Sequence, residues 1–204
     1  MFLLSPGAEL LAIFCRFELM RKTPACLIAC LSWLSLWLGG CDVGADLRPV
    51  QHGAYFRMLL PRWLDSLETR HGEAQFQYGN RRRNLFVSVR YDSLTALQRR
   101  YPRHALEDYY DQHLERLIEP MRDVRAPAPD SLRLATCPAL LGHFDGTFKK
   151  DDLHFSLLLV QDHLWLFQVL VWMPRKRYTE WEDMTTRMLR SFEPIPPPFI
   201  DQEK

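Results

Sequence analysis

The sequence predicts an α+β domain in which helices flank an antiparallel β-sheet. Three observations support this fold class. Residues 74–93 contain two strand-length runs joined by a turn, and residues 132–174 contain four more such runs. Residues 104–119 and 178–192 carry apolar side chains at the spacing of an amphipathic helix.

The first strands are expected in AYFRMLLP and AQFQYGN, residues 54–61 and 74–80, with a turn-like segment between them. A third strand is expected over residues 83–93. Its apolar side chains alternate with polar ones and are Leu85, Val87, Val89 and Tyr91. The connection GNRRRN predicts a hairpin in which Gly79 and Asn80 can take positive φ.

Two helices are expected next. Residues 93–101 favour a short helix, and residues 104–119 favour a longer one that Pro120 ends. The apolar side of the longer helix consists of Leu106, Tyr110, Leu114, Leu117 and Met121, and its polar side of Asp108, Asp111, Glu115 and Arg116. Residues 122–131 are expected to form a loop.

Four strands are expected between residues 132 and 174, with turns at Pro138, at 149–152 and at 162–163. The run from 164 to 173 contains a single polar residue, Gln168. A strand that is apolar on both faces has to be covered on both faces, so this one belongs in the middle of the sheet. Trp165 and Trp172 lie seven residues apart and are expected to point to opposite faces.

A closing helix over residues 178–192 is expected to begin with a capping box of Thr179 and Glu182. Its apolar stripe consists of Tyr178, Trp181, Met184 or Thr185, Met188 and Phe192, which should pack on the sheet with Trp181 buried. Residues 195–204 are a proline-rich tail.

The first forty residues resemble an export signal. An apolar run of about 15 residues ends at Gly39 and Gly40, whereas a membrane-spanning helix needs roughly 20 apolar residues. Arg21 and Lys22 precede the run and supply the positive charge of a signal peptide. Residues 1–19 fit an export signal poorly, because they open with an apolar segment that acidic and basic residues interrupt. A start of translation at Met20 gives a compact signal and is therefore expected. A genuine long leader is the alternative.

The quartet LGGC, residues 38–41, resembles the lipobox of bacterial lipoproteins. This resemblance implies that residues 1–40 are removed, that the Cys41 thiol is joined to a diacylglycerol, and that the new amino terminus receives an acyl chain such as palmitate. The alternative is an uncleaved anchor helix with an incidental cysteine. Residues 41–52 then form a lipidated tether, and residues 53–194 form one domain.

Charge and cysteine content restrict the partners. The removed segment holds three of the 26 basic and two of the 25 acidic residues, so the chain from Cys41 onward is formally neutral. Nothing in this balance indicates a nucleic-acid partner. Cys137 lies in an apolar stretch and is expected to be a buried thiol without catalytic reactivity.

The segments MLLPRW, residues 58–63, and MLRSFEP, residues 188–194, resemble the PsbP-like superfamily, and within it the DcrB-type envelope lipoproteins. The likeness covers roughly residues 53–194. It implies an α/β/α sandwich around an antiparallel sheet, in a superfamily that mostly serves assembly, binding and chaperone roles. It implies no catalytic residues, no metal and no cofactor.

Three groups of polar residues are candidates for chemistry. His104, Asp108, Asp111 and His113 crowd one helix, where a solvated face is favoured over a metal site because the two histidines diverge. Asp145, Asp151, Asp152 and His154 surround an expected hairpin turn, and a turn is favoured over acid–base or calcium chemistry. Arg81, Arg82 and Arg83 could meet anionic lipid headgroups, although a solvated turn is the simpler interpretation.

Two functions of different classes follow. The first is a lipid-anchored binding or assembly module of the bacterial envelope, facing the periplasm, with a protein partner that includes the possibility of a toxin. The second is a periplasmic hydrolase or metal-dependent enzyme. Convergence of Asp145, His154 and another titratable group in a cleft would favour the enzyme. Asp42 resembles an inner-membrane retention signal, but inner and outer membrane both stay open.

Overall fold

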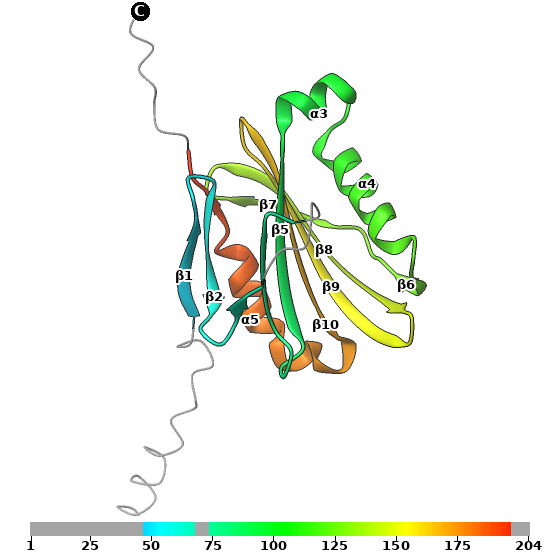
Figure 1. Cartoon of the computed structure of the whole chain (residues 1–204). Helices are drawn as coiled ribbons and strands as arrows, with labels where there is room; N and C mark the ends of the chain where they lie inside the picture. The colour runs from blue at the N-terminus through cyan, green and yellow to red at the C-terminus, as the bar shows by residue number, and fades with distance from the viewer. Residues whose placement is uncertain (1–46, 68–73, 197–204) are drawn as a thin grey trace, which may run out of the picture. The chain divides into compact units, whose positions relative to one another are not determined.

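The computed structural model describes residues 47–67 and 74–196 (Figure 1). The predicted signal region, the start at Met20, the cleavage before Cys41 and the lipidation of Cys41 all fall outside these ranges. None of the helices within the ranges has the length and apolar character needed to span a bilayer.

An antiparallel sheet of eight strands forms the centre of the fold, in the order β3-β4-β5-β10-β9-β8-β6, with β7 also pairing with β8. The strands are β3 (Asp65–Ser66), β4 (Phe76–Asn80), β5 (Leu85–Ser93), β6 (Arg122–Arg125), β7 (Asp130–Leu134), β8 (Cys137–Phe148), β9 (Asp151–Gln161) and β10 (Trp165–Pro174).

Strand β10 is central, as its apolar run predicted, and pairs with β5 on one side and β9 on the other. Val169 and Val171 are fully buried in the core on one face, where Trp165 also packs. Trp172 packs in the core on the opposite face. The two tryptophans therefore point to opposite faces, as expected.

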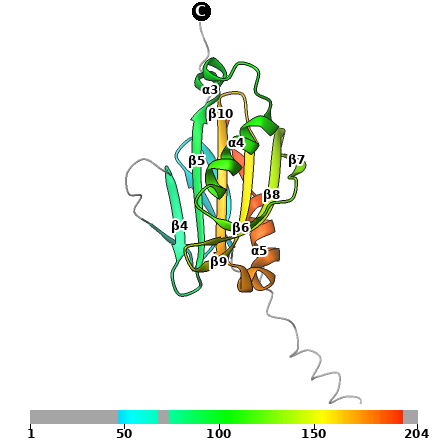
Figure 2. The same ribbon diagram turned by 90° about the vertical axis from the view of Figure 1, so that its right-hand side faces the viewer.

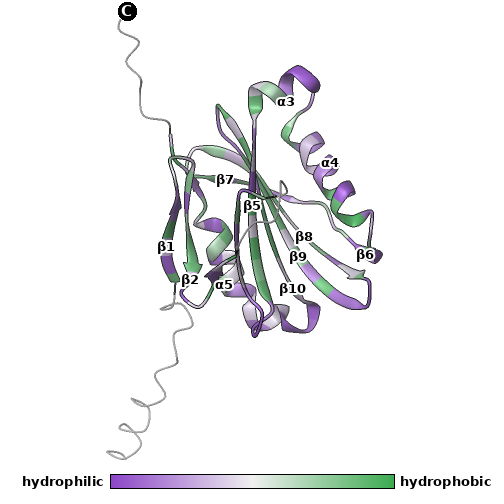
Figure 3. Ribbon diagram, in the orientation of Figure 1, coloured by the Kyte–Doolittle hydropathy of each residue, from purple (hydrophilic) through white to green (hydrophobic). Residues whose placement is uncertain are grey.

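Helices cover both faces of this sheet, which confirms the α+β fold class (Figures 1 and 2). One face carries α3 (Leu94–Arg100) and α4 (Leu106–Ile118), and α4 packs against β8 and β9. The other face carries α5 (Tyr178–Arg190), which the short 3-10 turn η3 (Arg175–Arg177) precedes. Hydrophobic residues concentrate in the central strands of the sheet (Figure 3).

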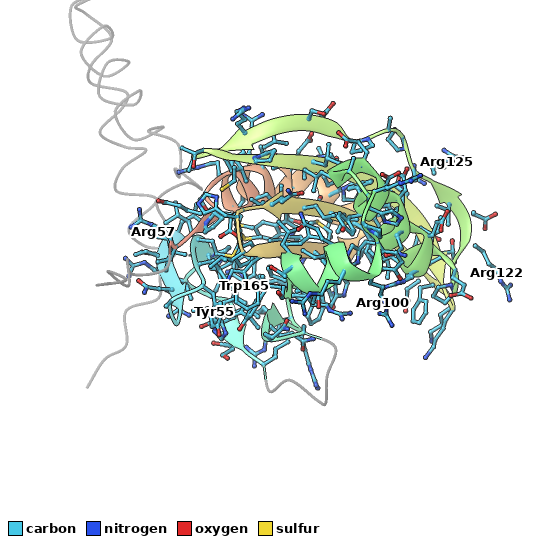
Figure 4. The ribbon with its side chains drawn as sticks, turned by 90° about the horizontal axis from the view of Figure 1, so that it is seen from above. Tyr55, Arg57, Arg100, Arg122, Arg125 and Trp165 are labelled. Atoms are coloured by element: carbon cyan, nitrogen blue, oxygen red, sulfur yellow. The ribbon has the colours of Figure 1, made fainter. Side chains whose placement is uncertain are left out.

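A second, three-stranded sheet lies on the α5 side and was not predicted. It consists of β1 (Leu47–His52), β2 (Phe56–Pro61) and β11 (Glu193–Pro194). Residues 47–52, which the sequence placed in the tether, instead pair along their whole length with β2. Arg57 of β2 forms a bidentate ion pair with Glu193 of β11, and Figure 4 shows Arg57 at this edge of the molecule. Tyr55 packs edge-on against Trp165 of the large sheet.

Several local expectations need correction. Helix α5 begins after Arg177 without a side-chain cap, so the predicted Thr179–Glu182 capping box is not formed. Pro138 lies inside β8, and the turn before it has positive φ at Ala135. In the β4–β5 hairpin the residue with positive φ is Asn84, whereas the predicted Gly79 and Asn80 both lie in β4. The expected loop over 122–131 contains β6 and the start of β7.

Candidate functional site

A polar cluster interrupts the apolar face beneath α5. The antiparallel register of β8 and β9 places Asp145 opposite His154 and His143 opposite Ser156. The Nδ1 atom of His154 lies 2.8 Å from Asp145 Oδ1, and His143 Nδ1 lies 2.9 Å from Ser156 Oγ. Arg175 of η3 adds an ion pair to the second oxygen of Asp145, with Nε 3.2 Å from Oδ2.

The first turn of α5 contacts this cluster through Tyr178. The Tyr178 ring stacks on the His154 ring with centroids 3.7 Å apart, and its hydroxyl donates to Glu182 Oε1 at 3.2 Å. The rings of His143 and His154 stack at 5.8 Å. We call His143, Asp145, His154, Ser156 and Tyr178 the histidine cluster.

Both histidines of the cluster favour the neutral form. Burial lowers the pKa of His154, although its hydrogen bond to Asp145 acts in the opposite direction. Burial and the neighbouring His154 lower the pKa of His143. A neutral His154 whose Nδ1–H donates to Asp145 keeps its lone pair on Nε2, and Nε2 is buried without a hydrogen-bond partner in the part of the chain that the structure describes.

The cluster lacks the access and the connectivity of a hydrolase site. Ser156 is fully buried and His154, under the Tyr178 ring, is 5% exposed, whereas His143, Asp145 and Tyr178 are half-buried. Ser156 bonds to His143 whereas Asp145 bonds to His154, and a Ser-His-Asp relay requires one histidine to contact both. Asp145 and His154 do converge with other titratable groups, but they do so under a helix rather than in a cleft.

Two of the predicted site residues lie farther from the hairpin turn than the sequence indicated. Asp145 and His154 lie inside β8 and β9, and the turn itself is Lys149 and Lys150, with positive φ at Lys149. Asp151 and Asp152 are exposed at the start of β9, and Asp152 accepts a hydrogen bond from Thr147 at 2.8 Å.

Sequence reasoning missed four members of this environment. His143, Ser156, Arg175 and Tyr178 were not proposed as site residues. A signal was nevertheless present, because polar residues recur at every second position in both strands: His143, Asp145 and Thr147 in β8, and Asp152, His154 and Ser156 in β9. This spacing places all six on one face of the sheet.

The polar residues of α4 do not share one environment. Asp108 Oδ2 accepts a hydrogen bond from the Ala105 backbone N–H at 2.7 Å, and Asp111 is exposed. The expectation of a solvated face is wrong for His113, which is buried between α4 and the sheet. Burial lowers its pKa to about 4, and Arg116 acts in the same direction.

No metal site is formed by these candidates. His104 stacks on Tyr101 with centroids 4.7 Å apart rather than approaching His113. Among residues 47–67 and 74–196, no group of three or more His, Cys, Asp or Glu side chains is arranged to hold a metal ion. Cys137 is buried as predicted, and burial raises the pKa of its thiol.

An open groove lies between the tips of two hairpins and the β10–η3 corner. Phe86 and Trp172 form its apolar part, with half-buried rings stacked 5.4 Å apart. Its charged lining residues are Lys150, Asp151, Asp152, Arg175 and Lys176. The groove has a volume of about 890 Å³. Such a surface suits contact with a large partner more than enclosure of a small substrate.

The predicted basic hairpin is divided between two roles. The Arg83 guanidinium lies 4.5 Å from the Trp63 ring centroid and 5.8 Å from that of Trp181, so Arg83 packs on the fold through cation–π contacts. Arg177 donates a hydrogen bond to the Arg83 carbonyl oxygen at 3.1 Å. Arg81 and Arg82 are exposed.

Comparison with known proteins supports the fold. No protein-family model and no curated protein matched the chain. Among solved structures, the chain is similar to the cyanobacterial PsbP protein CyanoP from Synechocystis sp. PCC 6803, with a TM-score of 0.58 and 13% identity, over 77% of this chain and 98% of that one.

It is also similar to a mutant of the protein Mog1, with a TM-score of 0.55 and 12% identity, over 74% of this chain and 97% of that one. LpqN, a protein involved in cell envelope biogenesis of Mycobacterium tuberculosis, gives a TM-score of 0.52 and 10% identity, over 74% and 91%. At these identities the likeness shows the fold alone, and that fold is PsbP-like as predicted.

Proposed function

We propose that this chain is a lipoprotein of a bacterial envelope membrane, anchored through Cys41, whose domain acts by binding a partner protein rather than by catalysis. The closed histidine cluster is the observation that carries the non-catalytic part of this proposal. A catalytic acid or base has to reach the reacting atoms of a substrate, and His143, His154 and Ser156 are paired with each other or with Asp145 beneath α5.

The anchor supports binding as the mode of action. Attachment to a membrane confines the domain near other envelope proteins and raises the effective concentration of a partner, so that modest affinity is enough. The fold is compatible with this role, since LpqN, which has a similar fold at low identity, is described as involved in cell envelope biogenesis.

The test is complementation of a deletion strain with full-chain variants. Cys41→Ala should no longer be processed and acylated like the parent. Replacement of the signal and Cys41 by a cleavable export signal without a lipidated cysteine should release the domain from the membrane and should fail to complement, because the domain is no longer held near its partner. His154→Gln and Asp145→Asn, which keep polar groups of similar size, should complement and stay anchored. Asp152→Ala, His104→Ala and Asp108→Ala should also complement.

Two outcomes would contradict the proposal. If Cys41→Ala protein is processed and membrane-bound like the parent, the lipid anchor is wrong. If a histidine-cluster variant is anchored at parental levels and yet fails to complement, the domain uses that group chemically, and the hydrolase alternative takes precedence. Immunoblots of the membrane fraction measure the amount of each variant.

A further inference from the structure

Positive charge gathers at one end of the domain. The exposed cations there are Arg62, Arg81, Arg82, Lys149, Lys150 and Lys176, which we call the basic end. They come from the segment after β2, the β4–β5 turn, the β8–β9 turn and the β10–η3 corner, and the groove joins the last three of these segments. All three lysines of the described residues belong to this set. Hydrophilic residues mark these tips in Figure 3.

The acidic side chains near this end do not neutralise the set. Asp145 is paired with Arg175 and His154, and Glu180 with Arg177 at 3.4 Å. No ion pair engages the six cations of the basic end within residues 47–67 and 74–196. Three nearby carboxylates, Asp65, Asp151 and Asp152, face the six cations and leave the end with a surplus of positive charge.

The chain enters the domain at the same end. Leu47, the first residue of β1, pairs with Pro61, and Arg48 donates to the Leu64 carbonyl oxygen at 3.1 Å. The neighbouring Trp63 accepts a hydrogen bond at its carbonyl oxygen from Asn80, at the edge of the β4–β5 turn, at 2.8 Å. Figure 1 shows the start of β1 at the same end of the domain as the tip of this hairpin and the start of α5.

The sequence between anchor and domain is short. Leu47 lies six positions after Cys41, and six fully extended residues span roughly 20 Å. If Cys41 is acylated, Leu47 at the basic end therefore stays within about two and a half Debye lengths of the membrane surface at physiological salt, where the Debye length is about 8 Å. The end that carries α3 is the more distant one (Figure 1).

We infer that the basic end is a membrane-contact surface that binds the anionic headgroups of the same membrane that holds Cys41. This inference rests on the anchor in the proposed function. Clustered Lys and Arg side chains are attracted to anionic lipid surfaces. The half-buried, stacked rings of Trp172 and Phe86 add an apolar surface beside these cations. Tryptophan favours the headgroup region of a bilayer. Headgroup contact would fix the orientation of the domain on its membrane.

The lysines allow this contact to be measured on the full chain. Protein purified from the membrane fraction is reconstituted in vesicles of phosphatidylcholine, or of phosphatidylcholine with phosphatidylglycerol. A water-soluble acetylating reagent then labels exposed amines, and mass spectrometry reports each lysine. In the anionic vesicles, labelling of Lys150 and Lys176 should fall about threefold or more and should recover in high salt. Lys204, in the tail, serves as the internal reference.

Two matched variants separate headgroup contact from general charge effects. Arg81→Glu with Arg82→Glu should abolish the protection of Lys150 and Lys176 in anionic vesicles. Arg99→Glu with Arg100→Glu makes the same change in charge in α3, where both side chains are also exposed, and should leave the protection intact. Figure 4 shows Arg100 on α3, away from Arg57 and the second sheet.

Equal labelling of Lys150 and Lys176 in neutral and anionic vesicles would overturn the inference. Protection that appears in native membranes but not in protein-free anionic vesicles would also overturn it and would indicate an acidic protein partner instead. The mass of the amino-terminal peptide in the same digest reports whether Cys41 is acylated, so a failed anchor is distinguished from a failed lipid contact.

Discussion

The two faces of the large sheet are stabilised in different ways. The face under α5 and the second sheet holds the larger apolar cluster, which includes Phe56, Phe167 and Met188. Two side-chain hydrogen bonds join its strands, His154 with Asp145 and His143 with Ser156, although Trp181 Nε1, Thr185 Oγ1 and His154 Nε2 are buried without a hydrogen-bond partner among the described residues. This face is therefore stabilised both by apolar packing and by hydrogen bonds between side chains that lie opposite each other in β8 and β9.

The face under α3 and α4 holds a smaller cluster built around Tyr109, Tyr110 and Phe155. It also buries two polar side chains with weaker support. His113 has a pKa lowered by burial, and Gln168 Oε1 has no hydrogen-bond partner among the described residues. The difference teaches that side-chain hydrogen bonds between β8 and β9 support the α5 face, whereas Gln168 and the Tyr109 hydroxyl of the α4 face have buried oxygen atoms without a partner in the described ranges. Polar substitutions on the two faces should therefore behave differently.

The largest effect is expected from Trp181→Ala on the α5 face. Trp181 of α5 is buried at 7% exposure, and its ring contacts the Trp63 ring and the Arg83 guanidinium. Truncation of a core aromatic residue to alanine lowers the free energy of unfolding by about 3–5 kcal/mol. Urea unfolding followed by circular dichroism measures the change. Trp172→Ala, which removes a half-buried tryptophan from the other face, is the control and should cost less.

The second effect concerns pH and compares the titration of His113 on the α4 face with that of His143 and His154 on the α5 face. The folded-state pKa of His113 is about 4, below the ordinary value of 6.5, so folding favours the neutral ring. Its contribution to stability is complete above pH 6.5 and is lost as the pH falls toward 4, because the unfolded chain binds the proton first. The loss amounts to about 3 kcal/mol, since a tenfold change in proton affinity corresponds to about 1.4 kcal/mol.

His113→Phe removes this titration while keeping an apolar ring in the same place. The variant should lose less stability than the parent between pH 7 and pH 4.5, measured as urea midpoints at both values. His143 and His154 also have lowered pKa values, so some acid sensitivity should persist in the variant. An identical pH dependence in parent and variant would show that His113 is already protonated or exposed.

The third effect tests the close fit of the α4 face. Gly142 of β8 lies under Tyr110, and a Cβ atom there would overlap the Tyr110 hydroxyl. Gly142→Ala should therefore cost about 1–3 kcal/mol of overpacking strain. Tyr110→Phe removes the overlapping oxygen, so the double variant should lose less than the sum of the two single changes. Strict additivity in the double-mutant cycle would mean that the helix moves away instead.

The elements with strong periodicity were predictable from the sequence. Strands β5 and β10 and helices α4 and α5 each carry a long apolar pattern that a single chain segment displays by itself. Strand β1 was missed because its residues, LRPVQH, show no clear alternation. It is an edge strand whose backbone pairs only with β2 in the described sheet, and such a position tolerates the proline.

The histidine cluster could be predicted only in part. Polar residues at every second position identify a polar stripe, but the pairing of Asp145 with His154 depends on the register of β8 and β9. That register is set by the two-residue turn at Lys149 and Lys150, which the sequence indicates only as a broader turn over 149–152. His113 was assigned to the solvated side because the buried face of α4 extends to Tyr109, four residues earlier.

The smallest effect compares one buried polar side chain on each face. Ser156 is fully buried and bonded to His143 at 2.9 Å, so Ser156→Ala leaves a nitrogen of the half-buried His143 without its partner. Loss of such a hydrogen bond should cost about 1 kcal/mol. Gln168 is also buried, at 8% exposure, but its Oε1 is unpaired within the described ranges, so Gln168→Met removes a desolvated oxygen that gains nothing from folding.

Gln168→Met should therefore change the free energy of unfolding by less than about 0.5 kcal/mol, or raise it, whereas Ser156→Ala should lower it. Urea midpoints at pH 7, with circular dichroism as the probe, resolve the two signs. Both residues lie in central strands and both changes keep the strand pairing, so the comparison isolates the polar partner. If Gln168→Met costs as much as Ser156→Ala, the Gln168 side chain is hydrogen-bonded in solution, and the polar groups of the two faces are equally well supported.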